Sequence, residues 1–282
     1  MEREKPKRNL RYYLKGMLSE KELALMPSAF DVVGDIMIFA DFPKELKKKE
    51  KDIAKVILEN YPHTKVVAKK AKKYSGKFRL PTIRIMGGER RKETIHRENG
   101  VLLEVHVEKA YFSPRSGTER QRIANQVKEG ESILVMFSGV GPFTIELAKH
   151  TKAKEVYGVE INPVAHHYAE INTVKNKVVG KVKNYNGDVK KIVPKLGLKF
   201  DRIIMPLPKG AEQYLPLAIS TAKKGGTIHF YDFLHQDEFE KAKEKIAKAC
   251  EKQGRKFRLL GVVPCGQYSP GYFRVCADFV VL

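Results

Sequence analysis

An apolar segment that ends in a glycine-rich turn is the feature that most limits what this chain can fold into. Residues 133–137 are apolar, and the turn that follows them contains Gly139 and Gly141. A second apolar run, 156–159, ends at Glu160. In doubly wound α/β sheets, such glycines let the backbone approach a nucleoside cofactor, and the acid accepts hydrogen bonds from the two ribose hydroxyls. The pattern therefore predicts a nucleoside cofactor as the ligand.

The chain carries much more positive than negative charge. Its 54 Lys and Arg residues against 33 Asp and Glu residues give a formal net charge of +21 over 282 residues. Because neutralisation of phosphates drives much of nucleic-acid affinity, this excess favours a nucleic-acid partner. The alternative is the Lys- and Glu-rich surface of a thermophile, which would carry many charges of both signs rather than this imbalance.

Other function classes receive no support from the sequence. No apolar run approaches the roughly 18 residues that suggest a membrane-spanning helix, and the N-terminus lacks the apolar core of a signal peptide. The three cysteines, Cys250, Cys265 and Cys276, have no CxxC spacing and are odd in number. We therefore expect reduced thiols, no metal site, no membrane association and a cytoplasmic protein. We also expect a monomer.

The pattern of elements predicts a basic segment followed by two domains. Residues 1–27 are basic and are expected to be mostly irregular, with a candidate short helix start at 11–14. Residues 28–110 contain a strand pair at 30–39, a helix at 44–60 with a Lys- and Glu-rich polar face, and further strand-like runs, the first at 64–67. This part is predicted to be a small α+β domain that binds RNA and substrate.

Residues 111–282 show a different pattern, in which strand-like and helical runs alternate. The strand-like runs are 132–137, 155–161, 181–185, 201–205 and 227–233. Alternation of this kind predicts a mostly parallel sheet with right-handed crossovers. Two further strand-like runs, 257–263 and 272–282, have no helix between them and should pair antiparallel. A parallel sheet closed by an antiparallel hairpin resembles the Rossmann-like class I AdoMet-dependent methyltransferase fold rather than the NAD dehydrogenase fold.

This fold makes AdoMet the expected cofactor. Gly139 and Gly141 would allow close approach to its methionine part, and Glu160 would bind the ribose. Asp188, at the end of the third strand, would accept from the adenine amine, beside a small Gly187. The alternatives are a solvated strand-end acid for Glu160 and an N-cap of the next helix for Asp188. The predicted cofactor residues in these loops are Ser138, Gly139, Gly141, Glu160, Ile161, Gly187 and Asp188.

Three motifs resemble those of a known family. They are FSGVGPF at 137–143, VEINP at 159–163, and YFSPR at 111–115 followed by Glu119 and Arg120. Together they resemble the archaeal and eukaryotic enzymes that modify the base at position 37 of tRNA. These include the guanine-37 N1-methyltransferase and its relative, the wybutosine-pathway aminocarboxypropyltransferase. The resemblance covers roughly residues 28 to 282, and the YFSPR-x-x-x-ER motif is not a general methyltransferase element.

The resemblance implies roles for charged residues in the first half of the chain. Glu119 would accept a proton near the target base, and Arg79 would stabilise negative charge that develops on that base. Arg115 would bind an RNA phosphate or base, and Arg120 or Ser113 would contact the cofactor. The alternatives are a solvated helix face with an ion pair worth a few tenths of a kcal/mol, and for Arg79 one more basic surface residue.

Two departures from the methyltransferase favour the aminocarboxypropyltransferase. The methyltransferase has an Asn-Leu/Pro-Pro motif after its fourth strand, whereas this chain has Met205-Pro206-Leu207-Pro208, so that Pro206 stands where the Asn is expected. Proline has neither a backbone N–H nor a polar side chain with which to bind guanine. The full-length methyltransferase also has an additional N-terminal domain that recognises the outer corner of tRNA, which we do not expect here.

The resemblance therefore implies transfer of the 3-amino-3-carboxypropyl group of AdoMet to carbon 7 of 4-demethylwyosine in tRNA(Phe). Methylthioadenosine would be released, and no metal would be needed. Two alternatives stay open, a tRNA guanine-37 N1-methyltransferase and a non-catalytic RNA-binding protein on a methyltransferase fold. The residues expected to bind RNA are Lys69, Lys70, Arg90, Arg91 and Tyr111.

Overall fold

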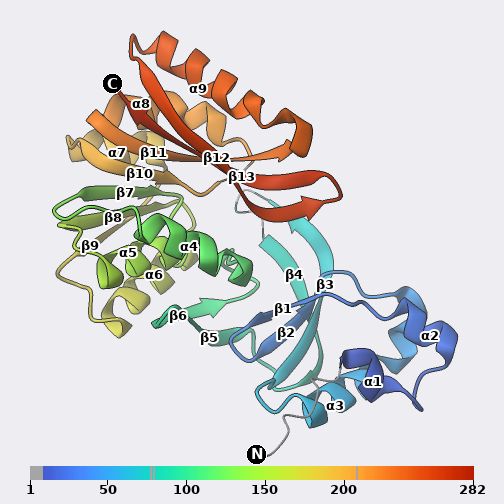
Figure 1. Cartoon of the computed structure of the whole chain (residues 1–282). Helices are drawn as coiled ribbons and strands as arrows, with labels where there is room; N and C mark the ends of the chain where they lie inside the picture. Colours follow the sequence, from blue (N-terminus) through green and yellow to red (C-terminus); the bar gives the residue numbers. More distant parts are fainter. Residues whose placement is uncertain (1–8, 77, 79, 208) are drawn as a thin grey trace, which may run out of the picture. The chain divides into compact units, whose positions relative to one another are not determined.

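The chain folds into two compact units, each of which is considered by itself (Figure 1). The computed structural model describes residues 9–282 except 77, 79 and 208, and describes only the backbone of 72–75. The smaller unit contains the described residues up to His96 together with Glu104–Pro114. The larger unit contains Arg97–Leu103 and Arg115–Leu282. The hairpin of β5 (Glu93–Glu98) and β6 (Val101–His106) is thus divided between the two units.

The smaller unit is built on a four-stranded sheet in the order β1-β2-β3-β4. Its strands are β1 (Phe30–Val33), β2 (Ile36–Phe39), β3 (Val66–Ser75) and β4 (Leu80–Gly88). Strands β2 and β3 pair in parallel, and the other two pairs are antiparallel. The parallel crossover passes through the 3-10 helix η1 (Lys44–Lys49) and α3 (Glu50–Asn60), which confirms the expected helix.

The N-terminal segment differs from the irregular structure expected for it. It contains α1 (Leu10–Leu14), capped by the side chain of Asn9, and α2 (Glu20–Leu25), which begins with a capping box of Ser19 and Glu22. Leu10, Leu14 and Leu23 of these helices are buried in the core of the smaller unit. The helix start expected at 11–14 is confirmed by α1, whereas α2 was not predicted, because a helix of six residues is too short to show a clear helical periodicity.

Strand β3 also extends beyond the run at 64–67 that was expected. It continues through a lysine-rich stretch in which Lys69 forms an ion pair with Glu50, and Lys70 lies 3.9 Å from Asp31. Lysine is depleted in strands on average, but its preference depends on the neighbours that it meets. Here these tertiary partners outweigh the weak local preference.

The larger unit has a seven-stranded sheet in the order β12-β13-β11-β10-β7-β8-β9. The strands are β7 (Ser132–Met136), β8 (Glu155–Glu160), β9 (Val182–Asn186), β10 (Phe200–Met205), β11 (Ala222–His235), β12 (Phe257–Ser269) and β13 (Tyr272–Val281). The five strands from β11 to β9 pair in parallel, and β13 pairs antiparallel with both β11 and β12. This topology confirms the expected class I methyltransferase sheet.

Helices connect these strands in the alternation that the sequence predicted. They are α4 (Gly117–Ala124), α5 (Pro142–His150), α6 (Pro163–Lys175), α7 (Val189–Leu196), α8 (Leu215–Thr221) and α9 (Glu240–Lys252). The chain order reverses between β7 and β10, so the loops after these strands diverge there. In open α/β sheets, ligands bind outside the carboxyl ends of the strands at such a point. None of the described helices combines the length and apolarity needed to cross a membrane.

Candidate functional site

The glycine turn after β7 has a conformation that requires its glycines. Gly139 and Gly141 have φ values of +58° and +86°, a region that side chains with a Cβ rarely adopt. The N–H of Ser138 donates to the carbonyl of Val159 on the neighbouring strand at 3.0 Å. The N–H of Gly141 donates to the carbonyl of Ser138 at 3.0 Å and closes the turn at the start of α5. The turn is therefore fixed against the end of β8.

Glu160 connects this turn to the next loop. Its Oε2 accepts from the N–H of Gly139 at 2.8 Å, and its Oε1 accepts from the N–H of Asn162 at 2.7 Å. The residue is 9% exposed, and burial raises the pKa of its carboxyl while these N–H groups oppose the shift. Each oxygen keeps a further lone pair with which to accept a ligand hydroxyl. These two acceptor positions fit two ribose hydroxyls, and the burial of Glu160 does not fit a solvated acid.

Asp188 and Gly187 lie in the loop that follows β9. Oδ1 of Asp188 accepts from the N–H of Lys190 at 2.9 Å, so the N-cap alternative describes a contact that the structure contains. A cap of this kind uses one oxygen and leaves Oδ2 for a ligand. Gly187, at φ +147°, donates its N–H to the carbonyl of Glu160 at 2.9 Å. Ile161, which follows Glu160, is half-buried. The predicted cofactor residues of these loops thus lie at the carboxyl ends of three adjacent parallel strands.

Pro206 follows the end of β10 directly. The N–H of Leu207 donates to the carbonyl of Met205 at 2.7 Å and closes a three-residue turn around the proline. Proline has no N–H, and that of Leu207 is used within the turn. The backbone from Met205 to Leu207 therefore offers a ligand acceptors but no N–H donor beyond that of Met205 itself.

The motif at residues 113–120 is divided between two ion pairs. Arg120 is 3% exposed and binds both oxygens of Glu98 at 2.5 and 2.6 Å, with its guanidinium 6.0 Å from the ring centre of Phe143. Glu119 is 5% exposed and binds other partners. Arg115 is exposed and Ser113 is half-buried. The structure therefore gives Glu119 and Arg120 separate surroundings, and their predicted roles stay predictions.

Tyr231 and Arg122 are the partners of Glu119, and the sequence analysis missed both. The hydroxyl of Tyr231 donates to Oε1 at 2.6 Å, and Arg122 donates to Oε2 at 2.7 Å and to Oε1 at 2.9 Å. The i,i+3 spacing of Glu119 and Arg122 on α4 was a signal that could have indicated this pair. Nothing local to the sequence indicates the contact with Tyr231, because 112 residues separate the two partners.

The residues expected to bind RNA differ in their exposure. Lys69 and Lys70 have the acidic neighbours described above, and the guanidinium of Arg91 binds Asp35 at 2.5 Å. Arg90 and Tyr111 are exposed, Tyr111 to 50%. The predicted catalytic residue Arg79 lies outside the described residues. Arg90 and Tyr111 are therefore the members of this set that the structure presents to solvent.

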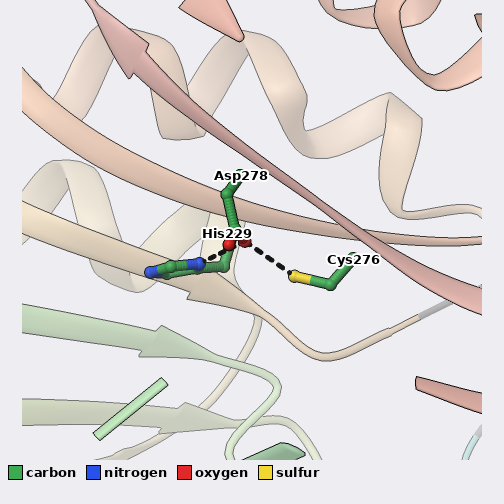
Figure 2. Close-up of side chains that lie close together, drawn as sticks. All are labelled: His229, Cys276 and Asp278. Carbon is green, nitrogen blue, oxygen red and sulfur yellow. Dashed lines mark hydrogen bonds and ion pairs between the residues drawn. The ribbon is translucent and has the colours of Figure 1, made fainter. Parts of the chain in front are cut away.

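One group of possible metal ligands lies among the described residues, and Figure 2 shows its members, His229, Cys276 and Asp278. Nδ1 of His229 lies 2.6 Å from Oδ1 of Asp278, and the Cys276 thiol donates to the same oxygen at 3.2 Å. Arg202 approaches Nε2 of His229 to 2.7 Å, and Arg122 approaches Asp278 to 2.5 Å. Two guanidinium charges against this cluster disfavour a cation, and its hydrogen bonds are satisfied without one.

Glu146, on α5, is a second buried acid that the sequence analysis did not identify. It is 1% exposed, and its Oε2 has no hydrogen-bond partner among the described residues. Burial, and then the negative charge of Glu98, raise the pKa of its carboxyl to about 7, against the attraction of Arg120. Glu146 therefore holds its proton more tightly in the folded chain than in the unfolded chain.

The substitution Glu146→Gln should change how stability depends on pH. In the wild type, the pKa of Glu146 is about 7 in the folded chain and 4.5 in the unfolded chain. The free energy of unfolding therefore falls as pH rises between these two values, and the loss persists above pH 7. The substitution removes this loss, so relative to the wild type the variant should gain about 2 kcal/mol between pH 5 and pH 8. Urea unfolding at both pH values measures it. Glu129→Gln, at an exposed acid, is the control, and a constant difference between variant and wild type would contradict the assignment.

Two protein-family models match the chain. The TRM5/TYW2 methyltransferase domain matches residues 94–260. The TYW2 N-terminal domain matches residues 10–91, which include the two short N-terminal helices.

Curated relatives of the chain include both methyltransferases and aminocarboxypropyltransferases. The tRNA (guanine(37)-N(1))-methyltransferase Trm5b of Pyrococcus abyssi is 41% identical over 257 residues, which cover 91% of this chain and 76% of that protein. The tRNA 4-demethylwyosine(37)-methyltransferase Taw21 of Saccharolobus solfataricus is 36% identical over 71% of this chain and 76% of its own length. The tRNA(Phe) (4-demethylwyosine(37)-C(7)) aminocarboxypropyltransferase of Methanocaldococcus jannaschii is 30% identical over 88% of this chain and 96% of its own length.

Solved structures show the same similarity. Trm5b from Pyrococcus abyssi superposes with a TM-score of 0.88 at 39% identity, over 98% of this chain and 82% of that chain. TYW2 from Pyrococcus horikoshii, in complex with MeSAdo, superposes with a TM-score of 0.82 at 26% identity, over 97% of this chain and 98% of that chain.

Proposed function

The chain belongs to the TRM5/TYW2 family, and on that premise we propose that it is an AdoMet-dependent transferase that modifies 4-demethylwyosine at position 37 of tRNA(Phe). The family match and the named relatives support a transferase that uses AdoMet and acts on tRNA. The choice of 4-demethylwyosine is the finer part of the proposal. It depends on one position in the structure, the end of β10.

Pro206 is the observation that carries this choice. A guanine at position 37 presents an N1–H and an amino group that the third ring of 4-demethylwyosine incorporates, so a polar side chain can recognise guanine through them. Pro206 has no polar side chain, and the turn uses the N–H of Leu207 internally. A proline instead provides apolar surface, which suits the additional ring of the tricyclic base. Among the relatives, both methyltransferases and aminocarboxypropyltransferases have 4-demethylwyosine in their names.

The donor site is proposed at the loops after β7, β8 and β9. Glu160 would accept the ribose hydroxyls, Asp188 would accept from the adenine amine through Oδ2, and Gly139 and Gly141 would allow the approach of the methionine part. Bound AdoMet supplies an electrophilic carbon next to its sulfonium. The MeSAdo complex of the P. horikoshii relative supports a nucleoside ligand on this fold. Ser113, Arg120, Ile161 and Pro206 remain proposed members of the site.

Glu119 is proposed to accept the proton that carbon 7 loses when the new bond forms. Two donors already bind its Oε1 and one binds its Oε2, so Oε2 keeps one acceptor position. A carboxylate that is fixed before the reaction needs no reorganisation to receive the proton. Arg79 would stabilise charge on the ring, and the exposed Arg115 would bind the RNA backbone.

Two groups are candidates for transfer. The first is the 3-amino-3-carboxypropyl group. Relatives from M. jannaschii and P. horikoshii transfer this group, as their names state, and this chain matches them over 96% and 97% of their lengths. The second is the methyl group. Higher identity favours it, because the 4-demethylwyosine methyltransferase Taw21 is 36% identical and the P. horikoshii aminocarboxypropyltransferase is 29% identical.

The proposed RNA surface is basic and partly aromatic. Arg90 and Tyr111 are exposed in the smaller unit, and bases beside the anticodon can unstack onto aromatic side chains. The formal net charge of +21 supports binding that weakens as salt increases. An archaeal source, a cytoplasmic location and a monomeric state belong to the same proposal.

The substitution Glu160→Gln should weaken AdoMet binding about tenfold or more, because hydrogen bonds to a charged acceptor contribute roughly 1.5–3 kcal/mol. Isothermal titration calorimetry measures the dissociation constant. Glu155→Gln is the matched control, since Glu155 lies at the amino end of the same strand, where it binds Lys183 and Tyr157. Equal losses in the two variants would contradict a ribose-binding role for Glu160.

A double-label assay tests the proposed reaction. AdoMet labelled in the carboxyl carbon or in the methyl carbon is incubated with tRNA(Phe) that carries either 4-demethylwyosine or guanine at position 37. We expect label in the 4-demethylwyosine tRNA, from the carboxyl carbon for the first candidate group and from the methyl carbon for the second. Methyl label that enters only the guanine transcript would overturn the proposed base and identify an N1-methyltransferase.

A further inference from the structure

Glu119 lies at one end of a largely buried chain in which acids alternate with guanidinium groups, with one histidine among them. Arg122 binds both oxygens of Glu119, and it also donates to Asp278 at 2.5 Å and 3.3 Å. One guanidinium thus joins helix α4 to strand β13. Side chains that each bind two partners in fixed geometry have few other positions available.

Asp278 is in turn held by groups on the sheet. Nδ1 of His229, on β11, lies 2.6 Å from Oδ1, and the Cys276 thiol donates to the same oxygen (Figure 2). Burial would raise the pKa of Asp278, but its bonds to His229 and Arg122 outweigh burial and keep that pKa well below its usual range. Asp278 is therefore an anion held by donors from His229, Cys276 and Arg122.

The chain continues through His229 to Arg202 and Glu131. Nη1 of Arg202 lies 2.7 Å from Nε2 of His229, and a guanidinium can only donate, so Nε2 must accept. Nδ1 then carries the proton that His229 donates to Asp278. Burial lowers the pKa of His229, which agrees with this neutral form. Arg202 binds Glu131 at 2.7 and 3.0 Å and ends the chain on a further acid.

Tyr231 holds the other side of Glu119. It is 2% exposed, and burial raises the pKa of its hydroxyl well above the usual value, so it stays a donor over the working range of pH. Its hydroxyl donates to Oε1 of Glu119 at 2.6 Å from β11. Among the described residues, the titratable or charged groups near Glu119 are Tyr231 on β11, Arg122 on α4, and Cys265 and Cys276 on β12 and β13, while Asp278 is linked to Glu119 through Arg122.

We propose that Tyr231 and Arg122 are positioning residues for Glu119, and that Asp278, His229 and Arg202 fix Arg122 in turn. The two donors orient the carboxylate and favour its charged form, so that the open acceptor position on Oε2 faces in one direction. This inference rests on the proposed role of Glu119 in the reaction. No metal is assigned to the cluster of His229, Cys276 and Asp278, because hydrogen bonds to guanidinium groups and within the cluster already use its ligand atoms.

The substitution Tyr231→Phe tests this inference with little change in shape. Glu119 keeps Arg122, so the variant should fold, and its affinities for AdoMet and tRNA should equal those of the wild type. The single-turnover transfer rate should fall about tenfold, as expected for the loss of a bond to a charged acceptor. The acid limb of the pH–rate profile should move to higher pH, because the carboxylate loses a donor that favours its charged form.

The control is Tyr157→Phe, which removes a tyrosine–glutamate bond of 2.6 Å to Glu155 on β8, away from Glu119. It should leave the rate and the pH profile unchanged. The assay uses whichever tRNA, with guanine or 4-demethylwyosine, the wild type modifies, so a wrong base in the proposed function leaves the comparison of variants intact. Equal rates and coincident pH profiles for Tyr231→Phe and wild type would overturn the inference.

A double-mutant cycle adds a second readout. In a Glu119→Gln background, Tyr231→Phe should have no further effect on the transfer rate, because the carboxylate that Tyr231 positions has been replaced by a neutral amide. Independent, multiplicative effects of the two substitutions would show that Tyr231 acts on the rate by another route and would overturn the inference.

Discussion

The hydrogen bonds of the buried residue Glu160 determine how the loops at the carboxyl ends of the central strands of the large sheet are arranged. It accepts N–H groups from the turn after β7 and from its own loop after β8, and its backbone carbonyl accepts the N–H of Gly187 after β9. An ionised group buried without such partners would be costly. One acid residue therefore connects three loops and fixes the shape of the crevice in which a nucleoside is proposed to bind.

A second buried system of charges lies on β10, β11, β13 and α4. In it the acids Glu119, Asp278 and Glu131 alternate with Arg122 and Arg202, so each charge has a neighbour of opposite sign. Replacing one member would leave a buried charge without its partner, which is strongly destabilising in general. In our account, the system of Glu160 serves the cofactor and the system of Glu119 serves the base.

The sequence predicted those features that depend on neighbouring residues. The glycine turn, Glu160 and the alternation of strands and helices are visible within windows of about ten to twenty residues, and the mostly parallel pairing of the sheet follows from them with general topological rules. The charge system of Glu119 was missed because its bonds join residues as far as 156 positions apart. The local signs of it were a single Asp in the strand β13 and the i,i+3 spacing of Glu119 and Arg122 on α4.

Other misses have equally specific physical reasons. Helix α2 and the full extent of α1 are too short for periodicity to define them, and the lysine-rich part of β3 is stabilised by acids on β1 and α3 that a local pattern cannot show. The sequence shows the charge of Lys69, Lys70 and Arg91 but not the carboxylates beside them, and the RNA-binding role of these residues stays a prediction.

A crystal structure of this protein with methylthioadenosine would show whether Glu160 and Asp188 bind the nucleoside. We expect the nucleoside at the carboxyl ends of β7, β8 and β9, with both ribose hydroxyls bonded to the carboxylate of Glu160 and the adenine amine bonded to Asp188. A nucleoside bound elsewhere, or one bound there without contact to Glu160, would contradict this expectation.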